Sequence, residues 1–151
     1  MYPKNVGGLI LEEAQHESIL DEQRKLLKGA DLEALNNMVA RMSNTADPKT
    51  EMDYSSVTRE QLRKSAPLPT IPYVVITSAD RSRAMPPMFS DSARVQLAAL
   101  GLELQQRLVD LIPGGKHIIA EGVGHNIHAE KPEILLKPLH EMIGTVKGTE
   151  D

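Results

Sequence analysis

The sequence predicts an α/β fold with an incomplete three-stranded parallel sheet, flanking helices and a helical cap insertion. Three short apolar runs rich in β-branched residues alternate with longer segments of helical periodicity. This alternation is typical of parallel sheets joined by right-handed crossovers. The chain has 151 residues, of which 40% are apolar and 25% charged, so we expect residues 1–151 to form one globular domain.

The first predicted strand is the apolar run Val6 to Glu12, VGGLILE. A buried strand of a parallel sheet needs neighbouring strands and cover on both faces. No earlier run in the sequence offers a neighbour. We therefore expect one edge of the sheet to stay unpaired, and we expect the chain to self-associate through that edge.

Residues 15–68 predict a helical insertion between the first two strands, because the composition becomes charged and helix-forming. The first helix is expected to begin after Ser18. Asp31 is a natural N-cap for a second helix over 32–42. A third, short helix is expected around 58–65, after a segment rich in Ser, Thr, Asp and Pro.

The second and third strands are predicted at Tyr73 to Thr77, YVVIT, and at Lys116 to Ala120, KHIIA. A long helix over 91–111 separates them, and a last helix runs from Pro132 to about Val146. The apolar side of the long helix is expected to comprise Val95, Leu97, Leu100, Leu104, Leu108 and Leu111.

Candidate catalytic residues follow all three predicted strands. Glu12 and Glu13 end the first, Asp80 follows the second and His125 follows the third. The carboxyl ends of parallel strands meet at one edge of a sheet, where functional residues gather. A carboxylate that accepts a hydrogen bond from one imidazole nitrogen fixes the tautomer, so the other nitrogen can take a proton from a nucleophile. His125 with Asp80 is therefore a candidate acid–base pair, although an Asp at a strand end is also a common turn or cap residue.

The stretch from Glu121 to Glu133, EGVGHNIHAEKPE, resembles the histidine loop of α/β-hydrolases: a Gly-His step, an acidic residue, and Pro-Glu at the start of the last helix. The segment VGGLILEEAQHE is similar to the sixth strand of that family, and IPYVVITSAD to the seventh. The resemblance covers nearly the whole chain. It implies the C-terminal part of the fold, with 15–68 as the cap.

The resemblance further implies hydrolysis of esters or related acyl bonds by a Ser-His-Asp type mechanism. His125 matches the general base, and Asp80 matches the acid after the seventh strand. Thr77-Ser78-Ala79-Asp80 lacks the glycine of the family's Gly-x-x-Asp turn, so Glu13, at the end of the sixth strand, is the alternative acid. We rank Asp80 ahead of Glu13. No metal and no cofactor are implied.

The nucleophile is missing from the sequence. No serine lies in a G-x-S-x-G elbow, and the chain has no cysteine. By the resemblance, the elbow precedes the sixth strand. We therefore expect this chain to supply acid and base, to be inactive alone, and to act on a small-molecule substrate only when an N-terminal segment completes it. The alternative is a non-catalytic binding or interaction module derived from the same fold.

Charge and spacing argue against other classes of function. The net charge of −4 and the scattered basic residues give no nucleic-acid footprint. No stretch approaches the roughly 20 apolar residues of a membrane span, and no leader is evident, so we expect a soluble, cytoplasmic protein. A metal site is not expected, because the possible ligands in this region do not have the spacing of a recognised metal motif. These residues are His117, Glu121, His125 and His128.

Overall fold

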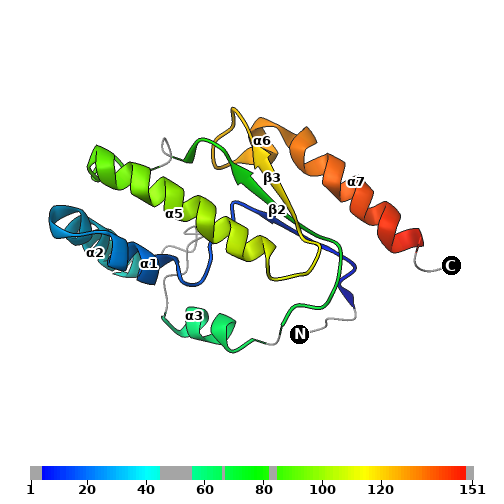
Figure 1. The fold of residues 1–151 in the computed structure, drawn as a ribbon, viewed down its shortest axis with the longest axis horizontal. Helices are drawn as coiled ribbons and strands as arrows, with labels where there is room; N and C mark the ends of the chain where they lie inside the picture. The colour runs from blue at the N-terminus through cyan, green and yellow to red at the C-terminus, as the bar shows by residue number, and fades with distance from the viewer. Residues whose placement is uncertain (1–4, 45–55, 66, 82–84, 149–151) are drawn as a thin grey trace.

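The computed structural model describes residues 5–44, 56–65, 67–81 and 85–148. An open sheet of three parallel strands lies at its centre, in the order β1 (Leu9–Glu12), β2 (Tyr73–Ser78) and β3 (Lys116–Ala120) (Figure 1). The predicted α/β arrangement with a three-stranded parallel sheet is thereby confirmed. The first strand is shorter than predicted, because its pairing with β2 starts only where the Leu9 amide donates to the carbonyl of Pro72 at 2.9 Å.

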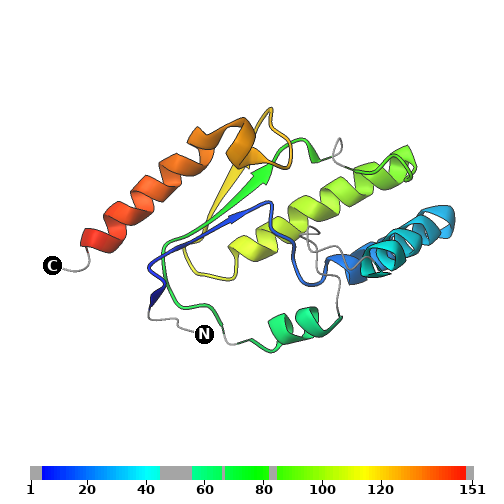
Figure 2. The same cartoon turned by 180° about the vertical axis from the view of Figure 1, so that it is seen from behind.

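One long helix covers each face of the sheet. α5 (Asp91–Val109) lies on one face and α7 (Pro132–Gly148) on the other, as the two opposite views show (Figures 1 and 2). Alternate residues of β2 supply the two cores: Tyr73 and Val75 pack with α5, while Val74 and Ile76 pack with α7. All six residues of β2 are buried, which explains why this strand is apolar along its length instead of alternating.

The described part of the predicted insertion forms α1 (Ile19–Leu26), α2 (Gly29–Asn44) and α3 (Ser56–Arg63). α1 and α2 share a core with α5 and the segment before it (Figure 2). The buried members of this core are Leu20, Leu27, Leu35, Phe89, Ala93 and Leu97. α5 therefore packs against the sheet through its C-terminal half and against α1 and α2 through its N-terminal half.

Asp31 does not cap the second helix as predicted. α2 begins at Gly29, so Asp31 lies inside its first turn. The Asp31 carboxylate instead accepts hydrogen bonds from the Ser90 amide and the Ser90 hydroxyl, both at 2.8 Å. The Ser90 hydroxyl in turn accepts from the Ala93 amide and caps α5. Asp31 thus links the first turn of α2 to the start of α5 through its hydrogen bonds to Ser90.

The predicted apolar side of the long helix is partly wrong. Leu97 is 2% exposed and Leu104 is also buried, whereas Val95 is 66% exposed. The buried stripe runs through positions three or four residues apart, and Val95 stands two residues before Leu97, well off that stripe. Leu111 is exposed as well, because it lies beyond the end of α5.

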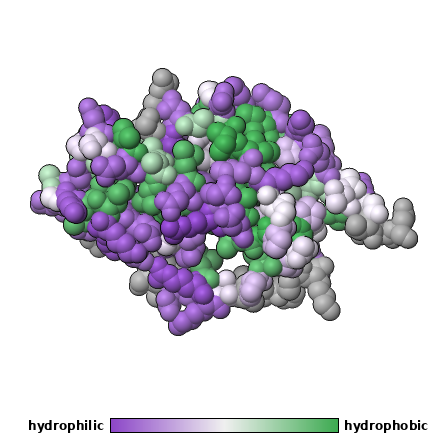
Figure 3. Space-filling model, viewed as in Figure 1, coloured by the Kyte–Doolittle hydropathy of each residue, from purple (hydrophilic) through white to green (hydrophobic). Residues whose placement is uncertain are grey.

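The surface in Figure 3 carries apolar patches interspersed with polar ones. Leu136 and Ile143 of α7 are among the exposed large apolar side chains. Among the described residues, the helices are all too short or too polar to cross a membrane.

We predict that Leu97→Ala lowers the free energy of unfolding by about 2 to 5 kcal/mol, because it leaves a cavity between α1, α2 and α5. Val95→Ala on the same helix is the matched control, with an expected change within about 0.5 kcal/mol. Urea denaturation of both variants measures the difference. Equal losses would contradict the packing of α5 described above.

Candidate active site

The carboxyl ends of the three strands lie at one edge of the sheet, as parallel pairing requires (Figure 1). Ser78 at the end of β2 is in register with Ala120 at the end of β3. The chain leaves β1 through Glu13, whose amide donates to the carbonyl of Ile76 at 2.9 Å. This edge brings together residues that are far apart in the sequence.

His125 and Glu13 meet at this edge. His125 Nδ1 lies 3.4 Å from Glu13 Oε2, at the long end of the range for a hydrogen bond. The Glu13 side chain is 6% exposed, whereas the His125 side chain is 60% exposed. A carboxylate can only accept, so this contact favours a proton on Nδ1 and leaves Nε2 as the basic nitrogen.

The second oxygen of Glu13 is held by two donors. Oε1 accepts from the Ser78 amide at 2.7 Å and from Arg81 Nη1 at 3.0 Å. Glu13 also has a φ of +46°, in the left-handed region that residues other than glycine adopt uncommonly. Such a conformation costs about 1 to 3 kcal/mol and is concentrated at functional sites. The strained backbone thus belongs to the residue whose carboxylate meets His125.

The loop that presents His125 is fixed on both sides. Gly122 has a φ of +65°, which a side chain would strain. The Gly124 amide donates to Glu130 Oε2 at 2.9 Å, and the Ser78 hydroxyl donates to the carbonyl of Val123 at 2.7 Å. The histidine loop is therefore tied to its own acidic residue and to the end of β2.

A second carboxylate–histidine pair lies beside the first. His128 is in the short helix α6 (Ile127–Glu130), and its amide donates to Glu12 Oε1 at 2.8 Å. His128 Nδ1 lies 2.9 Å from the same oxygen. Two consecutive glutamates thus contact two histidines of one loop. The sequence identified both strand-end carboxylates but did not predict this pairing.

Asp80, the first-ranked acid, comes two residues after the end of β2 and is half-buried. Its amide donates to the Ser78 hydroxyl at 3.3 Å. Its role stays a prediction, and the contact that the structure records for His125 is with Glu13.

A buried polar network lies on the α5 side of the sheet. The Thr77 hydroxyl donates to Gln105 Oε1 at 3.2 Å, and Gln105 Nε2 donates to the carbonyl of Ala14. His117 Nε2 lies 2.9 Å from the Thr77 hydroxyl. Burial lowers the pKa of His117, and the nearby Arg81 guanidinium lowers it further.

Arg81 is the site residue that the sequence did not reveal. Its only sequence signal is Gly101 in the middle of a long helix, where a Cβ would lie 2.8 Å from Arg81 Nε.

The residues considered as metal ligands do not converge: among the described residues, no group of three or more His, Asp or Glu is placed to hold a metal ion.

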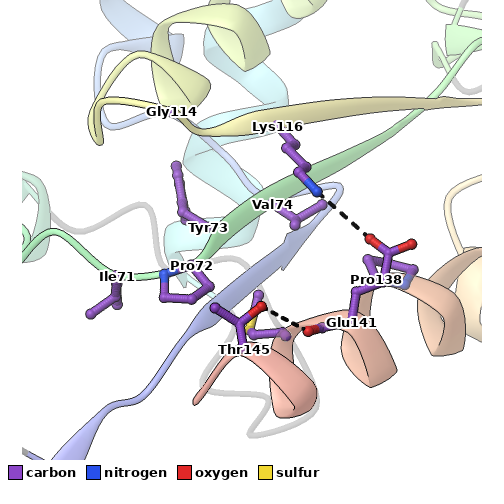
Figure 4. Close-up of a pocket in the computed structure, with 10 residues that line it drawn as sticks. Ile71, Pro72, Tyr73, Val74, Gly114, Lys116, Pro138, Glu141 and Thr145 are labelled. Atoms are coloured by element: carbon purple, nitrogen blue, oxygen red, sulfur yellow. Dashed lines mark hydrogen bonds and ion pairs between the residues drawn. The ribbon is translucent and has the colours of Figure 1, made fainter. Parts of the chain in front are cut away.

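A hollow of about 230 Å³ lies at the opposite end of the sheet, between the amino ends of β2 and β3 and helix α7 (Figure 4). Lys116 and Glu141 form an ion pair beside it, with 3.6 Å between Nζ and Oε2. The Thr145 hydroxyl donates to the carbonyl of Glu141 at 3.0 Å. These groups hold one another, and the hollow is remote from His125.

Comparison of the chain with models of protein families, with curated proteins and with solved structures finds no match. The geometry of the edge that holds Glu13 and His125 is therefore the guide to function.

We predict that Glu12→Ala speeds hydrogen exchange of the His128 amide by roughly tenfold to a hundredfold, because a hydrogen bond to a charged group contributes about 1.5 to 3 kcal/mol. Amide exchange measured by NMR tests this. Glu133→Ala, an exposed glutamate at the start of α7, is the control. Unchanged protection at His128 would contradict the recorded contact.

We also predict a loss of stability on acidification that depends on His117. Its lowered pKa means that the folded state binds its proton less readily than the unfolded state does. The stabilisation is complete above about pH 6.5 and is lost as the pH falls towards the lower, folded-state value. Urea unfolding at pH 7.5 and 5.5 should show a smaller loss in His117→Gln than in the unmodified chain.

The exposed His140 supplies the control for the substitution itself, since His140→Gln makes the same replacement at the surface. Burial lowers the pKa of His16 too, so part of the loss should persist in His117→Gln. An identical loss in His117→Gln and the unmodified chain would contradict the argument.

Proposed function

We propose that Glu13 and His125 are the acid and base of a hydrolase site of the α/β-hydrolase type, which acts on esters or related acyl bonds. In this proposal the chain corresponds to the C-terminal part of that fold, with 15–68 as its cap. The serine nucleophile comes from a G-x-S-x-G segment that this sequence does not contain. The observation that carries the proposal is the contact between His125 Nδ1 and Glu13 Oε2.

The surroundings of the pair support this assignment. Glu13 is buried and held at Oε1 by two donors, so its other oxygen keeps a fixed direction towards His125. The structure records no hydrogen bond between His125 Nε2 and any described residue. The ring is also exposed, and an exposed, unengaged Nε2 is what a general base needs to reach a nucleophile.

The arrangement of the chain supports the family resemblance at the level of topology. Three parallel strands follow one another in sheet order, helices α1 to α3 lie between the first two, and the histidine loop follows the third. The candidate acid lies at the end of β1, the strand that resembles the family's sixth. We therefore prefer Glu13 to Asp80 as the acid.

In the proposed reaction, Nε2 of His125 takes the proton of a serine hydroxyl as that oxygen attacks the acyl carbon. Glu13 holds the Nδ1 proton and stabilises the imidazolium that forms. The imidazolium then gives its proton to the leaving alcohol, and a water repeats the sequence to release the acid.

The first test is the nucleotide sequence immediately upstream of the first codon, read in all frames for a Gly-x-Ser-x-Gly segment. The second is hydrolysis of p-nitrophenyl esters by this chain alone and by the chain joined to that segment. We expect activity only in the joined form. There, Glu13→Gln should lower kcat by roughly 10⁴-fold and His125→Ala by roughly 10⁶-fold.

Two carboxylates serve as controls in the joined protein. Glu121→Gln alters an exposed carboxylate of the histidine loop and should leave kcat within about threefold. A large loss in Asp80→Asn, with Glu13→Gln unaffected, would move the acid to Asp80. Ester hydrolysis by the chain alone, abolished by His125→Ala, would refute the need for an added nucleophile. An upstream sequence without the elbow would favour the non-catalytic binding module.

A further inference from the structure

We propose that Arg81 is a positioning residue for the His125–Glu13 pair. In this proposal Gly101, which has no side chain, leaves the space on α5 through which Arg81 reaches Glu13. This inference rests on the proposed function, since it explains how the acid of that pair is aimed. It assigns a role to two residues that the hydrolase resemblance does not include.

The two carboxylate oxygens of Glu13 have different partners. Arg81 Nη1 and the Ser78 amide both donate to Oε1, at 3.0 and 2.7 Å. Oε2 is then the oxygen left towards His125 Nδ1. Without Arg81, one backbone amide alone would hold a carboxylate that can rotate, and either oxygen could turn away from the imidazole.

The environment makes this contact a strong one. Arg81 is 15% exposed and Glu13 is 6% exposed, so solvent screens their attraction little. A charged hydrogen bond between such groups is stronger than a neutral one. The buried carboxylate also needs a nearby cation, because an unpaired charge away from water is unfavourable.

Gly101 explains how a long cationic side chain fits there. A Cβ at position 101 would lie 2.8 Å from Arg81 Nε and 3.5 Å from Arg81 Nη2. Glycine inside a helix is unfavourable by about 0.5 to 1 kcal/mol relative to alanine, so its presence in α5 calls for a reason. Close packing of the guanidinium against the helix supplies that reason. Among the described side chains, Arg81 Nε is a buried polar atom without a hydrogen-bond partner, which fits a side chain placed for its terminal nitrogens.

The test measures the tautomer of His125 by ¹⁵N NMR of the isolated chain. The unmodified chain should show the proton on Nδ1. Glu13→Gln should move it to Nε2, because the amide oxygen meets the Ser78 and Arg81 donors and the amide nitrogen then donates to Nδ1. This variant defines the signal of a lost acid.

Arg81→Met should shift the tautomer ratio away from Nδ1–H, towards that of an unconstrained imidazole, and Arg81→Lys should restore part of it. Gly101→Ala should have the effect of Arg81→Met although it lies on another element and removes no charge. Gly144→Ala in α7 is the matched control, because a Cβ there meets nothing within 4 Å. Thermal melts identify folded variants, and if Arg81→Met does not fold, Arg81→Lys and Gly101→Ala make the same comparison.

The outcomes separate the two proposals. A His125 tautomer unchanged in the Arg81 and Gly101 variants, with Glu13→Gln still inverting it, would overturn the role of Arg81 and leave the acid–base pair intact. A tautomer unchanged in Glu13→Gln would overturn the pair itself. An equal shift in Gly144→Ala would show that the effect does not pass through Arg81.

Discussion

The burial of one carboxylate, that of Glu13, organises the carboxyl edge of the sheet. A carboxylate removed from water needs hydrogen-bond donors and a compensating charge. Three groups from other parts of the chain supply them: the Ser78 amide from the end of β2, the Arg81 guanidinium from the segment after it, and the His125 ring from the loop after β3. Groups from two loops and the end of β2 thus converge on a single buried charge.

The parallel sheet makes this convergence possible, and hydrogen bonds from α5 stabilise it. Because the three strands are parallel, their carboxyl ends lie at the same edge of the sheet. Glu12 at the end of β1 pairs with Ile76 of β2, and Ser78 at the end of β2 pairs with Ala120 at the end of β3. Beneath this edge, Gln105 of α5 bonds the carbonyl of Ala14, just past Glu13, and also accepts from Thr77 of β2. The exit from β1 is therefore held by a buried polar network, in which each bond is stronger than it would be in water.

The sequence could predict the three strands because β-branched runs such as YVVIT are a local signal, and it could predict α5 and α7 from their periodicity. It could also collect the candidate residues at one edge, since that follows from parallel pairing. It could not decide between Asp80 and Glu13, because the Glu13–His125 contact joins residues 112 positions apart. The role of Asp31 was wrongly predicted for the same reason: its partner, Ser90, lies 59 positions further along the chain, at the N-cap of α5. Arg81 had no local pattern at all, and only Gly101 gave an indirect sign of it.

The two adjacent glutamates show why the backbone conformation at Glu13 matters. In an extended strand, consecutive side chains point to opposite faces, so Glu12 and Glu13 could not both meet one loop. The left-handed φ of +46° at Glu13 breaks that alternation where β1 ends. Glu12 then contacts both the amide and the ring of His128, and the bond to the amide holds the loop backbone. In His125, by contrast, the group that Glu13 contacts is the ring. The strained residue is thus the one whose carboxylate meets the exposed ring of His125. Its unstrained neighbour fixes the loop that carries this ring, a division that fits the acid–base pair proposed above.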